Sequence, residues 1–195
     1  DGALCGAACG GARAGLLTGE IPDTFRETFM AGPRLSSATT DGVPTHGRIL
    51  IVEARYYGAI ADALLEGARR VLDAAGVEWD IVSVTGSLEV PQAVAIALEA
   101  PVHTRRLPFD GIVALGCVIR GETTHYEAVA GECASGIQAA QLETGVPIAF
   151  GALTVENLDQ ALARSEGPGG HNVGEDGAKV AVEMARLLGQ IRSGA

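Results

Sequence analysis

Strand-like and helix-like segments alternate four times along this chain, and no other feature restricts its fold as strongly. Short apolar runs rich in β-branched residues occupy residues 48–53, 80–86, 109–119 and 146–154. Segments with apolar residues at helical spacing follow them at 59–76, 89–100, 124–143 and 157–166, and the same spacing predicts a last helix at 175–191. Such alternation is typical of a parallel sheet with helices on both faces. The sequence therefore predicts an α/β fold: a single-domain, three-layer α/β/α sandwich around a four-stranded parallel sheet.

The predicted domain covers residues 47–195, and the segment before it has a different composition. Residues 1–46 are rich in Gly, Ala, Pro, Ser and Thr and show no sustained period. We expect a flexible N-terminal extension there, with at most one short helix near residues 21–30.

Charge and cysteine usage argue against several kinds of partner. The chain has 14 basic and 24 acidic side chains, a formal net charge of −10 and no run of Lys or Arg, so neither nucleic acid nor an anionic membrane is an expected partner. It has no apolar run long enough to span a membrane. The four cysteines, Cys5, Cys9, Cys117 and Cys133, lack metal-ligand spacing, which favours a reduced, cytoplasmic protein without a bound metal.

The loops that follow the strands form the candidate site, because ligands of parallel α/β sheets bind beyond the carboxyl ends of the strands. After the first strand, Tyr56 and Tyr57 either stack on an aromatic ligand or close the edge of the core. After the second, Ser87 lies in a tight turn and Glu89 opens a helix. The Glu89 carboxylate either accepts hydrogen bonds from hydroxyl groups or only caps the helix.

The third loop, within "GCVIRGETTHYEAV" (116–129), carries more polar chemistry than a helix start requires. The main-chain N–H groups of Glu122 and Thr123 can face an anion, Gly121 lets the main chain approach closely, and the Thr123 hydroxyl adds a donor. His125, predicted one turn into the helix, would lie beside the anion with a ring that titrates near neutral pH. The combination predicts a phosphate site next to a proton shuttle.

The fourth strand end offers Phe150 as a second aromatic wall and Arg164 near the end of the next helix. A cation at a helix end is also expected as a complement to the helix dipole, so Arg164 taken alone is expected to be a solvated surface residue. No loop has the spacing of a Ser-His-Asp triad, a Walker motif or G-x-G-x-x-G, and no cofactor or metal is expected.

Four motifs resemble, in order and spacing, those of the 6,7-dimethyl-8-ribityllumazine synthase family of riboflavin biosynthesis. They are "GSLEVP", "ALGCVIRGETTHYEAV", "PIAFGALTVEN" and "AVEMARLL", and the similarity runs from about residue 47 to 188. The resemblance implies a flavodoxin-like fold, with the sheet extended by an N-terminal strand from or to a neighbouring subunit. It also implies a transferase that joins 5-amino-6-(D-ribitylamino)uracil to (S)-3,4-dihydroxy-2-butanone 4-phosphate and releases phosphate and water.

Roles for individual residues follow from the same resemblance. Tyr56 would stack on the pyrimidine, the turn at Ser87 and Leu88 would hold the uracil edge, and Glu89 would bind the ribityl hydroxyls. His125 would be the general acid/base. The main chain of residues 117–119 (Cys117, Val118 and Ile119) would also contact the uracil, as would Phe150. The phosphate would be bound by Glu122, Thr123 and Arg164.

The resemblance also implies that Phe150 and Arg164 reach the site of a neighbouring subunit. The loop "GGHNVGEDG" is similar to that of fungal members, which assemble as pentamers, so a homopentamer is favoured over an icosahedral 60-mer, and His171 would be structural. A functional association with riboflavin synthase is a further expectation. Two other classes of protein stay open from the residues alone: a flavin- or lumazine-binding protein, and a shell-forming protein without turnover.

Overall fold

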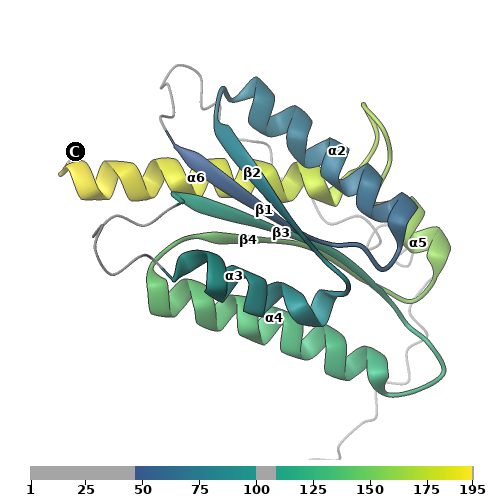
Figure 1. Cartoon of the computed structure of the whole chain (residues 1–195). Coiled ribbons are helices and arrows are strands. Elements are labelled where there is room, and N and C mark those ends of the chain that lie inside the picture. The colour runs from purple at the N-terminus through teal and green to yellow at the C-terminus, as the bar shows by residue number, and fades with distance from the viewer. Residues whose placement is uncertain (1–46, 100–108, 195) are drawn as a thin grey trace, which may run out of the picture. The chain divides into compact units, whose positions relative to one another are not determined.

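Four parallel strands in the order β2-β1-β3-β4 form the sheet at the centre of the fold (Figure 1). This computed structural model describes residues 47–99 and 109–194. The strands are β1 (Arg48–Ala54), β2 (Glu78–Val84), β3 (Gly111–Ile119) and β4 (Ile148–Val155). The helices are α2 (Gly58–Ala74), α3 (Val90–Leu98), α4 (His125–Thr144), α5 (Leu158–Leu162) and α6 (Val173–Ser193), and a 3₁₀ turn, η1, spans Ser87–Glu89.

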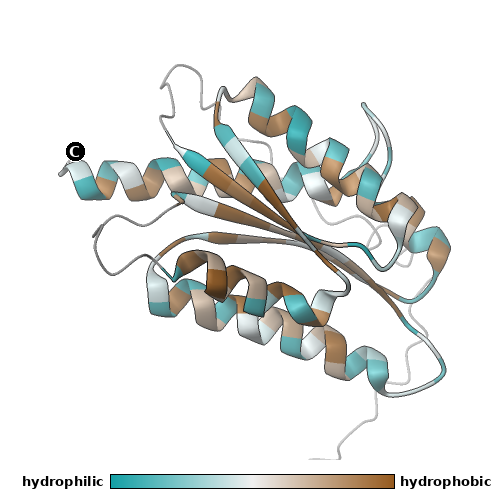
Figure 2. Cartoon of the chain, in the orientation of Figure 1, coloured by the Kyte–Doolittle hydropathy of each residue, from teal (hydrophilic) through white to brown (hydrophobic). Residues whose placement is uncertain are grey.

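Two helical layers cover the sheet, so the predicted three-layer α/β/α sandwich is confirmed. Helices α2 and α6 lie on one face and α3 and α4 on the other (Figure 1). Side chains of β1 alternate between the two cores: Ile51 packs with the α2 and α6 residues, and Val52 packs with those of α3 and α4. Brown, apolar residues run along the strands between these layers (Figure 2). Burial of both faces is what makes the strands read as apolar runs in the sequence.

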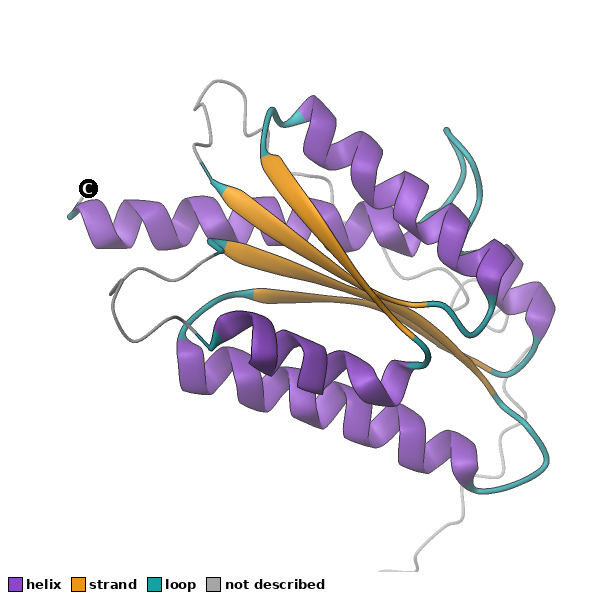
Figure 3. Ribbon diagram, viewed as in Figure 1, coloured by secondary structure: helices purple, strands orange, loops and turns teal. Residues whose placement is uncertain are grey.

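The strands end at different heights, and this stagger opens one edge of β3. Pairing between β1 and β3 stops at Glu53 and Leu115, whereas pairing between β3 and β4 continues to Ile119 and Val155. The last residues of β3 therefore extend past β1. The loops that leave all four strands lie at this same end of the sheet, on the right in Figure 3.

Among the element boundaries that differ from the sequence prediction, two have a clear local reason. The helix predicted over 157–166 ends at Leu162, because Ser165 turns back to form an antiparallel bridge with Asn172. The last helix begins at Val173, two residues early, because the Asn172 side chain caps it. The expected extension and its short helix lie outside the described residues. Among the helices described, none is both long and apolar enough to cross a membrane.

Candidate active site

The open edge of β3 is the floor of the candidate site. Cys117, Val118 and Ile119 pair with β4 on one side and extend beyond β1 on the other, so among the described strands their main-chain groups on that side have no partner. Unpaired strand edges are ready to bind a planar ligand that carries its own donors and acceptors. Burial raises the pKa of the Cys117 thiol to about 11, so the thiol stays neutral near pH 7. The main chain of this residue, rather than its sulfur, is what the site offers.

The η1 turn closes against this edge. The Ser87 side chain is buried beside Gly116, and Leu88 next to it is half exposed. One carboxylate oxygen of Glu89 accepts a hydrogen bond from the Gly86 N–H at 3.0 Å. The capping role considered for Glu89 is therefore present, and its side chain remains exposed at the mouth of the turn.

The two tyrosines after β1 differ in their environment. Tyr56 is 71% exposed, and its ring meets Tyr57 edge to face, with centroids 5.0 Å apart. Tyr57 packs against the core that contains Cys117; burial, with smaller effects of Tyr56 and Cys117, raises its pKa. Tyr57 thus closes the edge of the core, whereas most of the Tyr56 ring is exposed to solvent.

A polar cluster that sequence reasoning missed fixes the loop between β1 and α2. The Glu53 carboxylate is buried and accepts hydrogen bonds from Arg55 and from the Ser83 hydroxyl, at 3.0 and 2.7 Å. Arg55 also pairs with Asp62 of α2 at 2.6 Å. A charged residue at the end of an otherwise apolar strand was the available signal. The cluster ties both ends of the loop that carries Tyr56 to the sheet and to α2.

The mouth of α4 brings together the groups predicted for an anion and a proton shuttle. Glu122 and Thr123 lie in the bend before the helix, and within the described chain their N–H groups donate to no acceptor. The Thr123 hydroxyl accepts a hydrogen bond from the His125 N–H at 3.4 Å. His125 is the first residue of α4, so its predicted position one turn into the helix is wrong: it stands at the mouth itself, exposed.

Arg120, to which sequence reasoning gave no role, joins this mouth to the neighbouring loop. Its guanidinium donates to Glu127 in the first turn of α4 and to Glu156 after β4, the latter at 2.7 Å. It also lies 4.1 Å from the centre of the Tyr126 ring. The hydrogen bond to Arg120 is the main reason why the pKa of Glu127 is lowered. The acidic residues Glu127 and Glu156, in the segments that follow Arg120, were the signal in the sequence that could have indicated these ion pairs.

Phe150 lies within β4, and Arg164 follows the helix after that strand. Phe150 is the third residue of β4, opposite Ala114 and five residues before the strand ends, so the expectation of a strand-end aromatic is wrong. It is 42% exposed and lines an open groove of about 490 Å³ between β4, the end of α4 and α6. Arg164 follows α5 and donates to the Gln160 carbonyl at 3.0 Å.

Fold and site together define a parallel α/β protein with an open main-chain edge at the carboxyl end of its sheet and an imidazole at a helix N-terminus. Within the described residues, no cluster of His, Cys, Asp and Glu is placed to hold a metal.

Comparison with known proteins gives the family. The profile of the 6,7-dimethyl-8-ribityllumazine synthase family matches residues 46–189. Similar curated proteins carry the same name. The one from Afipia carboxidovorans is 46% identical over 158 residues, 81% of this chain and 96% of the relative. The one from Azorhizobium caulinodans has the same identity and coverage, and one from Rhodopseudomonas palustris is 41% identical over 85% of this chain and its own full length. The chain belongs to the 6,7-dimethyl-8-ribityllumazine synthase family, as its motifs predicted.

Proposed function

We propose that this chain condenses 5-amino-6-(D-ribitylamino)uracil with (S)-3,4-dihydroxy-2-butanone 4-phosphate to form 6,7-dimethyl-8-ribityllumazine. The observation that carries the proposal is the juxtaposition of three features at one edge of the sheet: the open main chain of β3, the η1 turn and the mouth of α4. Family membership and the name shared by the relatives support turnover by a transferase over the two alternatives, a flavin-binding or a shell-forming protein.

The pyrimidine lies between Tyr56 and the open edge of β3. The exposed Tyr56 ring stacks on it, and the main chain of residues 117–119 pairs with its carbonyl and N–H groups. The main chain at Ser87 and Leu88 holds the same edge from the opposite side. The Glu89 carboxylate, with one oxygen already bonded to Gly86, uses its other oxygen for the ribityl hydroxyls.

The phosphate occupies the mouth of α4. The N–H of Glu122, the hydroxyl of Thr123 and the dipole of a 20-residue helix supply donors and partial positive charge. Arg164 of a neighbouring subunit supplies the countercharge, and Phe150 of that subunit covers the pyrimidine. This division accounts for the position of Phe150 in its own chain, five residues before the end of β4.

Most of the acceleration comes from holding amine and ketone together, which is worth up to roughly 7–11 kcal/mol. The amine adds to the ketone and water leaves, giving an imine. Loss of a proton from the neighbouring carbon then expels phosphate, the resulting enol becomes a ketone, and ring closure releases a second water. These proton transfers recur near one point, which suits a single imidazole, and His125 at the helix mouth carries them.

The assembly is a homo-oligomer with sites between subunits, and a pentamer is favoured over a 60-mer. The groove beside Phe150 supports a second copy as its occupant, because exposed apolar side chains surround it: Leu142, Val180, Met184, Leu187 and Ile191. Sedimentation velocity separates monomer, pentamer and 60-mer. The enzyme works in the cytoplasm and passes its product to riboflavin synthase.

An assay with both substrates tests the function. Lumazine absorbance and free phosphate are followed together, and we expect them to rise with the same time course. A folded protein that binds flavin but produces neither signal would identify a binding protein on the same fold.

A further inference from the structure

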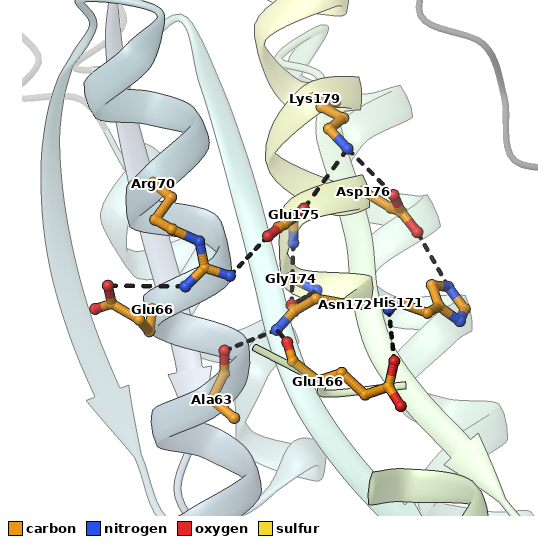
Figure 4. A network of polar contacts seen from close by, with 10 residues as sticks. All are labelled: Ala63, Glu66, Arg70, Glu166, His171, Asn172, Gly174, Glu175, Asp176 and Lys179. Carbon is orange, nitrogen blue, oxygen red and sulfur yellow. Dashed lines mark hydrogen bonds and ion pairs between the residues drawn. The ribbon is translucent and has the colours of Figure 1, made fainter. Parts of the chain in front are cut away.

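Asn172 is a buried polar residue for which the proposed chemistry has no use. Its side chain is 2% exposed and lies between α2 and α6 (Figure 4). The oxygen Oδ1 accepts from the N–H groups of Gly174 and Glu175, at 2.9 and 3.2 Å, and so caps α6. The nitrogen Nδ2 donates to the carbonyls of Ala63 and Glu166, at 3.0 and 2.9 Å. Both donors and both acceptor positions of the amide are therefore used.

The two donated bonds exceed what a helix cap requires. A cap needs only an acceptor, and Ser, Thr or Asp supplies one as well as Asn does. The Nδ2 group instead links α2, through Ala63, to the segment after α5, through Glu166. Ala63 is 109 residues away in the sequence, so the amide joins two parts of the domain that local structure would leave independent.

Close packing around the amide leaves it no room to shift. A methyl group on Gly67 of α2 would stand 2.3 Å from Asn172 Oδ1, and one on Gly174 would stand 2.0 Å from the Leu64 carbonyl oxygen. Gly174 needs glycine because it meets the main chain of α2, whereas a side chain at Gly67 would press on the Asn172 amide alone. The position of Asn172 relative to α2 is thus fixed by contact as well as by hydrogen bonds.

The main chain of Arg164 is bonded directly to this anchor. The Arg164 carbonyl accepts from the Val173 N–H at 2.9 Å, and Ser165 forms an antiparallel bridge with Asn172. The Glu166 N–H donates to the His171 carbonyl at 3.0 Å. The three residues from Arg164 to Glu166 therefore run beside residues 171–173, and the position of Asn172 sets the position of the Arg164 backbone.

We infer that Asn172 is a positioning residue for Arg164: its amide, clamped on α2, holds the turn from which the guanidinium reaches the substrate phosphate. The inference rests on the proposed role of Arg164. Its physical basis is that an error of about 1 Å in the position of a binding group can cost 10²-fold in rate. Without the Nδ2 bonds, the main-chain pairing of residues 164–166 with residues 171–173 remains. The hydrogen bond that fixes the turn relative to α2 is lost.

The variant Asn172→Ser separates the two halves of the amide. Serine keeps an acceptor for the α6 cap, and its short side chain does not reach both carbonyls. We expect the Michaelis constant (KM) for the butanone phosphate to rise by roughly tenfold, while KM for the ribitylaminouracil changes by less than about twofold. Arg70→Gln is the matched control, because it removes a 2.6 Å ion pair to Glu175 between the same two helices without touching the turn. It should leave both KM values unchanged.

A double-variant cycle with Arg164→Ala decides whether Asn172 acts through the arginine. If it does, Asn172→Ser adds no further rise in KM in the Arg164→Ala background. Equal increases in both KM values, or a full further increase in that background, would overturn the inference. An unchanged phosphate KM in Arg164→Ala alone would instead refute the role proposed for Arg164.

A second variant covers the case in which Asn172→Ser does not fold. Gly67→Ala pushes on the amide from the α2 side and leaves the residues of the turn untouched. It should reproduce the selective rise in the phosphate KM and weaken the binding of inorganic phosphate, measured by calorimetry, by a similar factor. Wild-type values for both quantities would contradict the inference.

Discussion

Ser87 and Gly116 touch so closely that a methyl group on Gly116 would stand 2.7 Å from the Ser87 hydroxyl oxygen. Within the described residues, this hydroxyl is buried without a hydrogen-bond partner. The contact holds the η1 turn against the open edge of β3, so the distance between this turn and the strand depends on the absence of a side chain at Gly116.

This contact predicts opposite effects for two small substitutions. Gly116→Ala should destabilise the fold by about 1–3 kcal/mol, because the added methyl group overpacks the junction. Ser87→Ala removes an unsatisfied buried hydroxyl and should be neutral or stabilising by up to about 1 kcal/mol. Urea unfolding at a fixed protein concentration measures both. The double variant should recover part of the loss; strict additivity would show that the two residues do not interact.

Arg120→Gln should weaken the mouth of α4, because it removes the cation shared by Glu127 and Glu156. We expect kcat to fall by roughly tenfold through misplacement of His125.

The lowered pKa of Glu127 predicts how the stability of the Arg120→Gln variant depends on pH. A lowered folded-state pKa contributes stability above the unfolded pKa and loses it as pH falls. The gap between wild-type and variant unfolding midpoints should therefore narrow from pH 7 towards about pH 3, and a constant gap would contradict the assignment.

His125→Ala should lower kcat by about 10²–10³, which lies inside the range of about 10²–10⁴ typical of general acid/base catalysis. The side chain is exposed at the helix mouth and its removal leaves no cavity, so stability should change little. Steady-state kinetics and titration with the pyrimidine substrate check the two parts. A variant that retains the full rate would exclude His125 as the proton shuttle.

Co-expression of His125→Ala and Arg164→Ala chains tests whether each site takes residues from two subunits. With the butanone phosphate held at the wild-type KM, each variant alone should be much slower than wild type, His125→Ala through kcat and Arg164→Ala through KM. In a random equal mixture, about a quarter of the interfaces combine an intact His125 with an intact Arg164, so about a quarter of the wild-type activity should return. If both residues served the same chain, every site would lack one of them and no activity would return.

Cys133 predicts a loss of stability at alkaline pH. Burial raises the pKa of its thiol to about 11, from an ordinary value of about 9. A group whose folded-state pKa is raised stabilises the fold below the unfolded pKa, and this contribution is lost as pH rises towards the folded value. Between about pH 9 and 11 the wild-type unfolding midpoint should therefore fall more steeply than that of Cys133→Ala. Parallel curves would show that the thiol does not titrate in this way.

The sequence by itself determined the layers of the fold and the chemistry at the strand ends. Apolar runs and helical spacing are local, and each follows from burial of one segment, so the parallel sheet and the polar mouth of α4 could be predicted. The motif "RGETTHYEAV" also carried enough specific residues to indicate the family.

Only the tertiary structure decided how these groups are held. The stagger that frees the edge of β3, the clamp of Arg120 on two loops and the reach of Asn172 to Ala63 all join residues from separate elements. The helix after β4 was predicted too long because its end is set by pairing between Ser165 and Asn172, seven positions further along the chain. Propensity and period describe one segment at a time, whereas these contacts exist only once the sheet has brought distant segments together.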